Sequence, residues 1–436
     1  MRLKPYPVYK DSGVEWLGEI PAHWQVERAD AFLRYDKVQV EPSTIIDEAV
    51  FLYSIPSVQT TGDGSLEAPS EIDSAKLRIV GERLLVSKLN PRKGVVLIAR
   101  EKNVPTLCST EFVPFEVEGC DLRWALYLFL AESTRQRLSA IVRSATRSHQ
   151  RAEISEIVKL WHAVPPLEEQ RVIAGLLDRA TARIDALVAK KERLIDLLKE
   201  RRTGLITFAV TKGLERNVPM KDSGVEWLGE IPAHWRALAL KRIGGLQAGA
   251  GFPDVEQGFQ DEEVPFFKVG DMGAPGNERE MLVHQHSVSR ATARRLGAFV
   301  FPTGTIVFAK VGAALLLNRR RLVARPSCID NNMMGFMPEE CYPAWAMYWL
   351  SELDMGELAN PGAVPSVNEG QMRGTPAAVP PPSEQSAIAA FLDRETARID
   401  DLITKVDDAI DRLKELRTAL ISAAVTGKID LREEVA

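Results

Sequence analysis

KDSGVEWLGEIPAHW, residues 10–24 of this chain, recurs without a change at residues 221–235. An exact repeat of fifteen residues, 211 positions apart, indicates that the chain contains two copies of one structural unit. We call these two segments the anchors. The rest of the 436-residue sequence is organised around them.

A second repeated pattern follows each anchor after a long interval. Pro-Leu-Glu-Glu-Gln at 166–170 leads to Thr-Ala-Arg-Ile-Asp at 181–185 and to Ala-Val-Thr at 209–211. Its counterpart starts with Pro-Pro-Ser-Glu-Gln at 381–385, and the same Thr-Ala-Arg-Ile-Asp follows at 396–400. The order is therefore anchor, insert and repeated segment, written twice.

The two inserts, 25–164 and 236–379, share little identity. The clearest common element is Cys-x3-Trp-Ala-x-Tyr, which begins at Cys120 and at Cys341. A duplication without functional meaning is the simplest alternative, but drift would not spare the anchors and rewrite only the inserts. The pattern favours one scaffold that carries two modules with different tasks.

The proline-led segments predict two long helices. Apolar residues recur at heptad spacing, which is typical of a helix that packs along a narrow seam against one other helix. In the first copy they are Leu177, Ala180, Ile184, Leu187, Leu194, Leu198 and Leu205, and in the second Leu392, Ile399, Leu402, Val406, Ala409, Leu413, Leu416 and Leu420. Prolines before each segment and Gly213 or Gly427 after it are start and stop signals. About 40 residues at ~1.5 Å each give a rod of roughly 60 Å, and an antiparallel pair within the chain would act as a ruler between the inserts. A coiled coil between chains remains the alternative.

Each insert is expected to mix strands and helices. Leu84–Val86, Val95–Ile98, Phe266–Val269 and Thr305–Phe308 read as strands, while 122–138 and 345–353 read as helices. The expected fold class is α+β: two α/β-type domains separated by a pair of long antiparallel coiled-coil helices, with a pseudo-twofold internal repeat. The expected segments are 1–24, 25–164, 165–213, 214–235, 236–379 and 380–436.

Charge along the inserts points to nucleic acid, although the net charge is −5. Residues 83–100 and 281–329 contain Lys and Arg, residues 133–152 contain Arg, and none of the three runs has an acidic residue. Phosphate contacts need cations without competing carboxylates, Arg suits guanine edges, and Asn or Gln suits adenine edges. A solvated surface is the alternative for any single run, and Trp124, Tyr127, Trp345 and Tyr348 are expected in the core rather than as base-stacking platforms. The candidate DNA-binding residues are Lys88, Asn90, Arg92, Lys93, Arg143, Arg147, Ser148, His149, Gln150, Arg151, Lys268, Lys310, Asn318, Arg319, Arg320, Arg321, Asn368 and Gln371.

The sequence lacks motifs for chemistry on DNA. It has no [DE]-x-K nuclease element, no Asn-Pro-Pro-aromatic or Asp-Pro-Pro-aromatic tetrapeptide for amino methylation, and no P-loop. Four scattered cysteines predict neither a disulfide framework nor a zinc site, and the pair His284 and His286 is expected at the surface. Without a signal peptide or a long apolar run, the expected location is the cytoplasm. No catalytic residue, metal or cofactor is expected on this chain.

The anchors and the proline-led segments together resemble the specificity subunit of type I restriction-modification systems. The resemblance spans the whole chain in the expected order. It implies that 25–164 and 236–379 are target-recognition domains, each reading one half of a split double-stranded DNA site, and that the helices set the gap. It also implies that the repeated regions dock two adenine-methylating subunits that bind S-adenosylmethionine, with ATP-driven restriction subunits as further partners in phage defence. The recognition residues of this family lie in variable loops, so none transfers by motif.

Two other classes of function stay open at this point. A coiled-coil adaptor that binds only proteins would make the basic inserts incidental, and DNA binding would exclude it. A self-contained modification enzyme would need chemistry that the motifs do not offer. Methyl transfer by the purified chain alone would support it.

Overall fold

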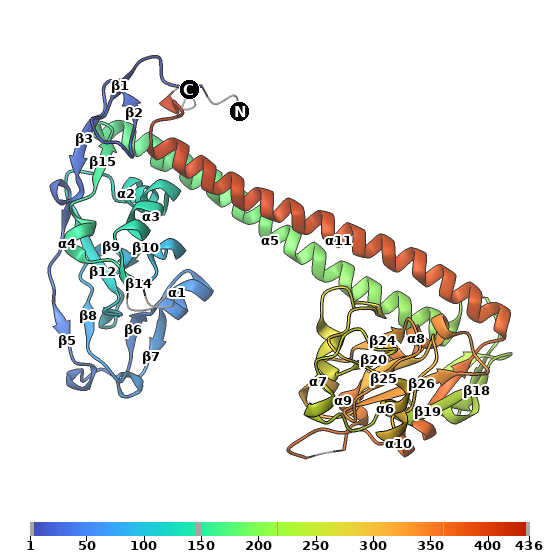
Figure 1. Ribbon diagram of the computed structural model, residues 1–436. Coiled ribbons are helices and arrows are strands. Elements are labelled where there is room, and N and C mark those ends of the chain that lie inside the picture. The colour runs from blue at the N-terminus through green and yellow to red at the C-terminus, as the bar shows by residue number, and fades with distance from the viewer. Residues whose placement is uncertain (1–3, 145–149, 216, 361, 433–436) are drawn as a thin grey trace. The chain divides into compact units, whose positions relative to one another are not determined.

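The computed structural model describes residues 4–144, 150–215, 217–360 and 362–432, which form two compact units (Figure 1). The first unit comprises Met1–Glu192 with Val406–Ala436, and the second comprises Arg193–Lys405. Each unit contains a domain of mixed helices and strands, together with part of each of two long helices. The predicted α+β class with two domains is therefore confirmed.

The first anchor forms a hairpin at the start of the first unit. Strand β1 (Tyr9–Asp11) pairs with β2 (Glu19–Pro21). Strand β3 (Gln25–Arg28) then pairs antiparallel with β15 (Trp161–Val164). The first and last strands of the domain are thus neighbours, so the chain enters and leaves the domain at one place.

Two sheets lie between β3 and β15. One has the strand order β10-β9-β12-β4, and the other has the order β5-β8-β11-β6-β7. The strands are β4 (Leu33–Arg34), β5 (Gln39–Val40), β6 (Val50–Tyr53), β7 (Ser65–Glu67), β8 (Lys76–Arg78), β9 (Glu82–Ser87), β10 (Val96–Arg100), β11 (Thr106–Cys108) and β12 (Phe112–Val117), with a separate hairpin of β13 (Arg143–Ser144) and β14 (Gln150–Arg151). The helices are η1 (Ala29–Ala31), η2 (Pro42–Thr44), α1 (Ile55–Thr61), η3 (Pro69–Glu71), η4 (Pro91–Lys93), α2 (Leu122–Leu130), α3 (Glu132–Ala140) and α4 (Ile154–Ile157).

The second unit repeats this plan. The second anchor forms the hairpin of β16 (Met220–Asp222) and β17 (Glu230–Pro232), and β18 (Arg236–Ala239) pairs with β27 (Pro376–Val379) to close the domain. The sheets have the orders β19-β26-β23-β24-β21 and β22-β20-β25. Their strands are β19 (Gly244–Ala248), β20 (Val264–Phe267), β21 (Glu280–Met281), β22 (Ser287–Val288), β23 (Ile306–Ala309), β24 (Arg320–Val323), β25 (Cys328–Ile329) and β26 (Met333–Pro338). The helices are η5 (Leu240–Arg242), η6 (Asp254–Glu256), η7 (Val269–Gly273), α6 (Arg290–Arg295), α7 (Ala313–Leu316), α8 (Pro343–Ser351), α9 (Met355–Leu358) and α10 (Glu369–Gly374).

The two domains share the centre of their strand plan, although their sequences and the numbers of strands in their sheets differ. The central strand, β9 or β23, has two antiparallel neighbours in each domain: β12 and β10 in the first, β26 and β24 in the second. A parallel pair belongs to the other sheet of each domain, β6 with β11 and β20 with β25. The internal repeat therefore extends beyond the anchors into the inserts.

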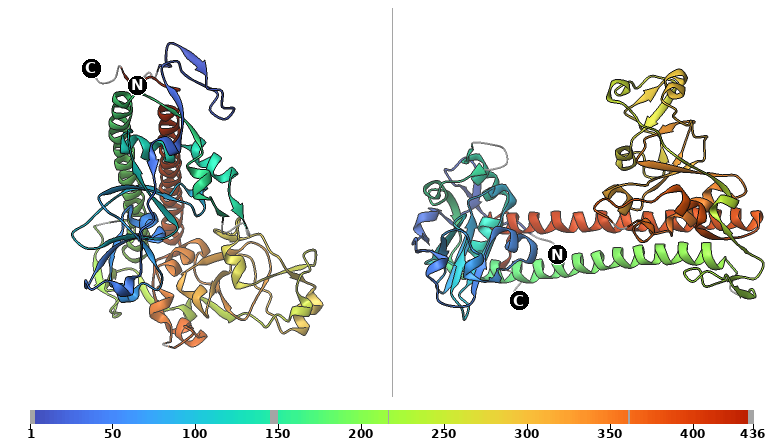
Figure 2. Two further views of the ribbon diagram at one scale, coloured as in Figure 1. Left: turned by 90° about the vertical axis from the view of Figure 1, so that its left-hand side faces the viewer. Right: turned by 90° about the horizontal axis from the view of Figure 1, so that it is seen from below.

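Helices α5 (Leu167–Lys212) and α11 (Pro382–Val425) pair within the chain. In the first unit Arg417 Nε lies 3.1 Å from Asp185 Oδ1, and in the second Arg202 Nε lies 2.9 Å from Asp400 Oδ1. Residue 185 of α5 pairs with residue 417 of α11, and the later residue 202 pairs with the earlier residue 400. The helices are therefore antiparallel, as predicted. The two ribbons run side by side within each unit in Figure 1 and in the right-hand view of Figure 2. Of the helices in the described part of the chain, none has an apolar stretch that would let it cross a membrane.

The predicted seam is wrong at alternate heptad positions. Leu187 and Leu194 are 41% and 42% exposed, whereas Ile195 is buried. On α11, Leu416 is 54% exposed and Ile410 is buried. The other half of the predicted series lies in the seam, where Leu177, Ile184, Leu392 and Ile399 are buried. The buried position is one residue further along the helix than predicted, so several leucines face outward.

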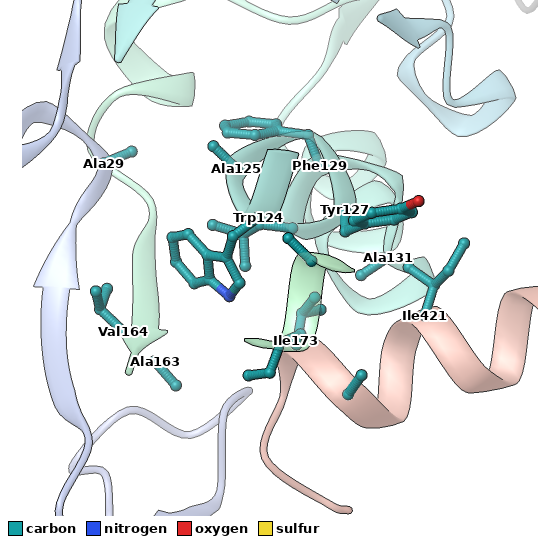
Figure 3. Close-up of a cluster of buried hydrophobic side chains, with 14 of the residues drawn as sticks. Ala29, Trp124, Ala125, Tyr127, Phe129, Ala131, Ala163, Val164, Ile173 and Ile421 are labelled. Atoms are coloured by element: carbon teal, nitrogen blue, oxygen red, sulfur yellow. The ribbon is translucent and has the colours of Figure 1, made fainter. Parts of the chain in front are cut away.

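The predicted aromatic core is confirmed. Trp124 and Trp345 are completely buried, and Tyr127 is 4% exposed. Figure 3 shows Trp124 and Tyr127 from α2 beside Ile173 of α5 and Ile421 of α11. The mixed domain of the first unit thus packs directly on its own stretch of the long helices, which fixes the domain to them.

A buried histidine distinguishes the first core from the second. His162 on β15 is 1% exposed, and neither ring nitrogen has a hydrogen-bond partner in the described part of the chain. The rings of Trp16, Phe32 and Phe129 surround it at centroid distances of 5.8–6.3 Å. Burial lowers the pKa of His162 to about 3, because a charged imidazolium is not solvated there.

We expect His162 to make the first unit less stable in mild acid. Between pH 6.5 and 3 the unfolded chain takes up a proton that the folded chain does not, so stability falls by up to ~1.4 kcal/mol per pH unit as the pH drops. The His162→Ala variant, which copies Ala377 at the matching position of β27, should lose this contribution. Urea unfolding at pH 7 and pH 5 measures it. An equal pH dependence in variant and unsubstituted chain would contradict the assignment.

Candidate nucleic-acid interface

Several candidate residues of the first domain meet at the end of the central strand. Lys88 follows β9 directly, and Arg92 and Lys93 lie exposed on η4. The backbone nitrogen of Asn90 donates to the carbonyl of Gln150 at 2.7 Å. We call Lys88–Gly94 the strand-end loop of the first domain. It lies against the β13–β14 hairpin, whose first strand begins at Arg143. Arg147, Ser148 and His149 lie outside the described residues.

Arg151 is already paired within the protein. Its Nη2 and Nε donate to the two carboxylate oxygens of Glu111 at 2.7 and 3.0 Å, and this pairing raises the pKa of Arg151. Arg83 likewise pairs with Glu116 at 3.2 Å. A basic run without acids in the sequence is therefore not free of acids in space, because neighbouring strands supply the carboxylates.

The matching loop of the second domain is Lys310–Asn318, its strand-end loop. Lys310 follows β23 just as Lys88 follows β9. Asn368 and Gln371 lie near its start, because Val367 donates its backbone nitrogen to the Lys310 carbonyl at 2.9 Å. The loop ends at Asn318, beside α9.

Four of the predicted base-reading amides hold the backbone. Asn90 and Asn318 have φ angles of 49° and 50°, a left-handed conformation that Asn and Gly tolerate best. Asn318 also accepts from the Met355 nitrogen at 2.8 Å. Asn368 and Gln371 form a capping box at the start of α10, in which each side chain accepts from the other residue's backbone nitrogen. These contacts explain the four residues structurally, without a nucleic acid.

Arg320 is a correction to the predicted list. It is 3% exposed, its Nη2 donates to the Leu353 carbonyl at 2.8 Å, and its guanidinium lies over the Phe308 ring. Burial lowers its pKa to about 10. The alternation of side chains along β24 turns Arg320 into the core, where it cannot contact a phosphate.

Arg320 and its neighbours line a cavity of about 470 Å³ in the second unit. Arg321 is half-buried and donates to the Met272 carbonyl at 3.0 Å, whereas Arg319 is exposed. Two further arginines that line the cavity form ion pairs, Arg202 with Asp400 and Arg279 with Asp393. Lys268, elsewhere in the unit, donates to Gln257 Oε1 at 3.0 Å.

A short set of candidate cations remains unpaired. Within residues 4–144, 150–215, 217–360 and 362–432, these side chains have no carboxylate within 4.0 Å and no hydrogen bond to another side chain. They are Lys88, Arg92, Lys93, Lys310 and Arg319. Such cations are the ones available to phosphate oxygens.

Sequence analysis missed the contacts that join each anchor to its helix. Glu169 of α5, 7% exposed, accepts from Tyr6 Oη at 2.6 Å and Trp24 Nε1 at 3.1 Å, and its other oxygen lies 2.7 Å from His23 Nε2. In the second unit Glu384 Oε2 accepts from Trp235 Nε1 at 3.0 Å and lies 2.8 Å from His234 Nε2. The sequence shows His-Trp at the end of each anchor and a Glu-Gln pair at the start of each long helix. This shared order in both copies was the signal that the two elements contact each other.

The glutamine after each glutamate ties the domain to the same helix. Gln170 accepts from the Asp121 nitrogen at 2.8 Å and donates to the Pro165 carbonyl at 2.9 Å. Gln385 does the same with Tyr342 and Pro380, at 2.7 and 2.9 Å. The Glu-Gln pair thus holds the anchor with its glutamate and the insert with its glutamine.

Comparison with known proteins identifies the class. No family model matches the chain. It is 25% identical over 259 residues to the type I restriction enzyme MjaVIII specificity subunit of Methanocaldococcus jannaschii, an alignment that covers 58% of this chain and 56% of that protein. It is 22% identical to the putative MjaX specificity subunit of the same organism, over 95% of this chain and 96% of that protein. The first alignment thus spans little more than half of its relative.

A solved structure has the same fold. A chain from a study of complex assembly and conformational transition of the type I R-M system matches with a TM-score of 0.76 and 15% identity, over 94% of this chain and 99% of that one. In sequence and in fold the chain is therefore similar to the specificity subunits of type I restriction-modification systems. The resemblance predicted from the repeated motifs is confirmed.

Proposed function

We propose that this chain recognises DNA sequence for a type I restriction-modification complex, with each domain reading one half of a bipartite site. The observation that carries the proposal is the pair of domains with one strand plan and different loops. A shared framework places both domains on DNA in the same manner, and different loops allow them to read different bases. The specificity subunits to which the chain is similar support it.

The paired helices would set the distance between the two half-sites. Both α5 and α11 contribute residues to each unit, and ion pairs join them in both. A stiff element between two readers turns a distance in the protein into a fixed number of base pairs. We retain 25–164 and 236–379 as the recognition domains, with the remaining segments as the common scaffold.

The anchors would dock two copies of a methyltransferase subunit. Their buried residues, such as Trp24 and Trp235, explain only part of the fifteen-residue identity. Glu15 and Glu19 are exposed and identical to the exposed Glu226 and Glu230, and internal packing does not require this. Identical exposed surfaces suit two copies of one partner. The outward-facing leucines Leu187, Leu194, Leu197, Leu402 and Leu416 would add apolar contact area.

Catalysis would belong to the partners. We assign no catalytic residue, metal or cofactor to this chain. S-adenosylmethionine is expected on the methyltransferase subunits, and ATP on restriction subunits where these are present. The substrate of such a complex is cellular and invading DNA, which places its work in the cytoplasm.

Selection from a randomised duplex library tests this function. The chain is mixed with its methyltransferase partner, and the bound duplexes are sequenced. We expect two short conserved blocks separated by an unspecified gap of constant length. A single continuous block would contradict the two-domain reader, and no enrichment would favour an adaptor that binds only proteins.

A further inference from the structure

The two strand-end loops are held by the same backbone hydrogen bonds. Lys88 donates its backbone nitrogen to the Glu111 carbonyl at 3.0 Å, and its carbonyl accepts from Ala152 at 2.9 Å. Lys310 donates to the Asn332 carbonyl at 2.8 Å and accepts from Val367 at 2.9 Å. The backbone of Lys88 is thus hydrogen-bonded to the segments that precede β12 and α4. The backbone of Lys310 is hydrogen-bonded in the same way to the segments that precede β26 and α10.

The next residues repeat the match. Asn90 donates to the Gln150 carbonyl at 2.7 Å, and Gly312 donates to the Pro365 carbonyl at 2.9 Å. Both donors have positive φ, 49° and 78°. A bridge joins Leu89 to Arg151, and its counterpart joins Val311 to Ser366. Lys88 and Lys310 therefore occupy one structural position in two domains that otherwise differ in sequence.

Beyond this position the loops diverge. The first continues with Pro91, Arg92 and Lys93 in η4, and the second with the apolar turn Ala313–Leu316. A contact that reads sequence has to differ between two domains that read different half-sites. A contact to the sugar-phosphate backbone is the same at every sequence, so it can be kept in both.

Both lysine side chains fit a phosphate contact. They are half-buried at the base and, in the described part of the chain, neither has a carboxylate partner. The fixed backbone places the Cα of each lysine, so no loop has to be ordered when the ammonium group binds. Ser87 and Ala309 before them are buried, so the strand positions each lysine at the edge of the core.

We propose that Lys88 and Lys310 are matched phosphate anchors, one in each domain, which seat the domain on DNA without reading its sequence. The proposal rests on the proposed DNA-recognition function and adds the residues and the kind of contact. The strand-end loops and the adjoining segments 150–152 and 365–367 then lie closest to the bases, and their differences account for the different half-sites.

The Lys88→Gln and Lys310→Gln variants test this pairing. Full-length chain with its methyltransferase partner is titrated with two duplexes, one carrying the selected blocks and one of mixed sequence, at several salt concentrations. Each variant should make the slope of log K against log salt shallower by about 0.9, and weaken binding to both duplexes by the same factor. In the double variant the slope should become shallower by about twice as much as in either single variant. Lys88→Arg and Lys310→Arg, which keep the charge, should retain most of it.

Lys241→Gln is the control, because Lys241 is an exposed lysine on η5 that belongs to neither strand-end loop. Unchanged slopes in both loop variants would overturn the proposal. Loss on the selected duplex alone would also overturn it, because it would mean that the lysines read bases. If the unsubstituted complex binds neither duplex, the proposed function fails and the pairing falls with it.

Discussion

Replacing residues 236–379 with the corresponding segment of a relative is expected to change one half of the recognised DNA sequence and to leave the other half unchanged. Each mismatched base pair costs about 1–3 kcal/mol, so a wholly exchanged half-site should lower affinity for the original duplex by several orders of magnitude. The library selection reads out both halves at once. The gap between the blocks should stay constant, because α5 and α11 are retained.

The reciprocal exchange of residues 25–164 is the matched control. It should change the block that residues 25–164 read and leave unchanged the block that residues 236–379 read. A change in both blocks from either exchange would show that the domains read DNA jointly, and the modular model would then be wrong. A changed gap with unchanged blocks would instead assign the spacing to the domains.

Removing the carboxylate of Glu169 is expected to cost much more than removing that of Glu384. Glu169 is 7% exposed and holds Tyr6, His23 and Trp24, whereas Glu384 is 27% exposed and holds only His234 and Trp235 among the described residues. Glu169→Ala leaves buried donors without an acceptor and should destabilise the first unit by about 3 kcal/mol or more. Glu384→Ala should cost the second unit about 1–2 kcal/mol.

Denaturant unfolding combined with hydrogen exchange at the two anchors separates the units. In Glu169→Ala the amides near Ile20 and Trp24 should exchange faster, while those near Ile231 and Trp235 stay protected. Glu169→Gln keeps one acceptor oxygen, which can still accept from Tyr6 and Trp24, and should recover part of the loss. Equal losses in the two alanine variants would contradict the difference in burial and in partners.

The periodic parts of the fold could be predicted from the sequence. The repeated motifs gave the two helices, their antiparallel pairing and their ends at Gly213 and Gly427, where the backbone adopts positive φ. The seam was predicted one residue away at alternate positions, because Leu194 stands beside the equally apolar Ile195 and strict heptad spacing selects the leucine. A leucine that faces outward for a partner has the same sequence signature as one in a seam.

The candidate site was harder to predict because it depends on contacts between distant segments. Arg151 lies in a run without acids, yet it pairs with Glu111, 40 residues earlier in the chain. Arg320 and Arg319 are adjacent, yet Arg320, the first residue of β24, is buried and Arg319, just before the strand, is exposed. The match between Lys88 and Lys310 rests on backbone hydrogen bonds, which leave no trace in side-chain identity.

The pairing of β3 with β15, and of β18 with β27, has a consequence for chain closure. Each insert begins and ends at one hydrogen-bonded pair of strands, so the scaffold holds the two ends together whatever lies between them. The entropic free energy of closing a flexible segment rises by only ~0.6 kcal/mol for each doubling of its length. A substitute domain of quite different size therefore has little entropic handicap, provided that its own terminal strands can be joined at this pair. Each strand pair is in this respect an insertion site. The size of the domain inserted there is limited by whether that domain folds, rather than by the rest of the chain.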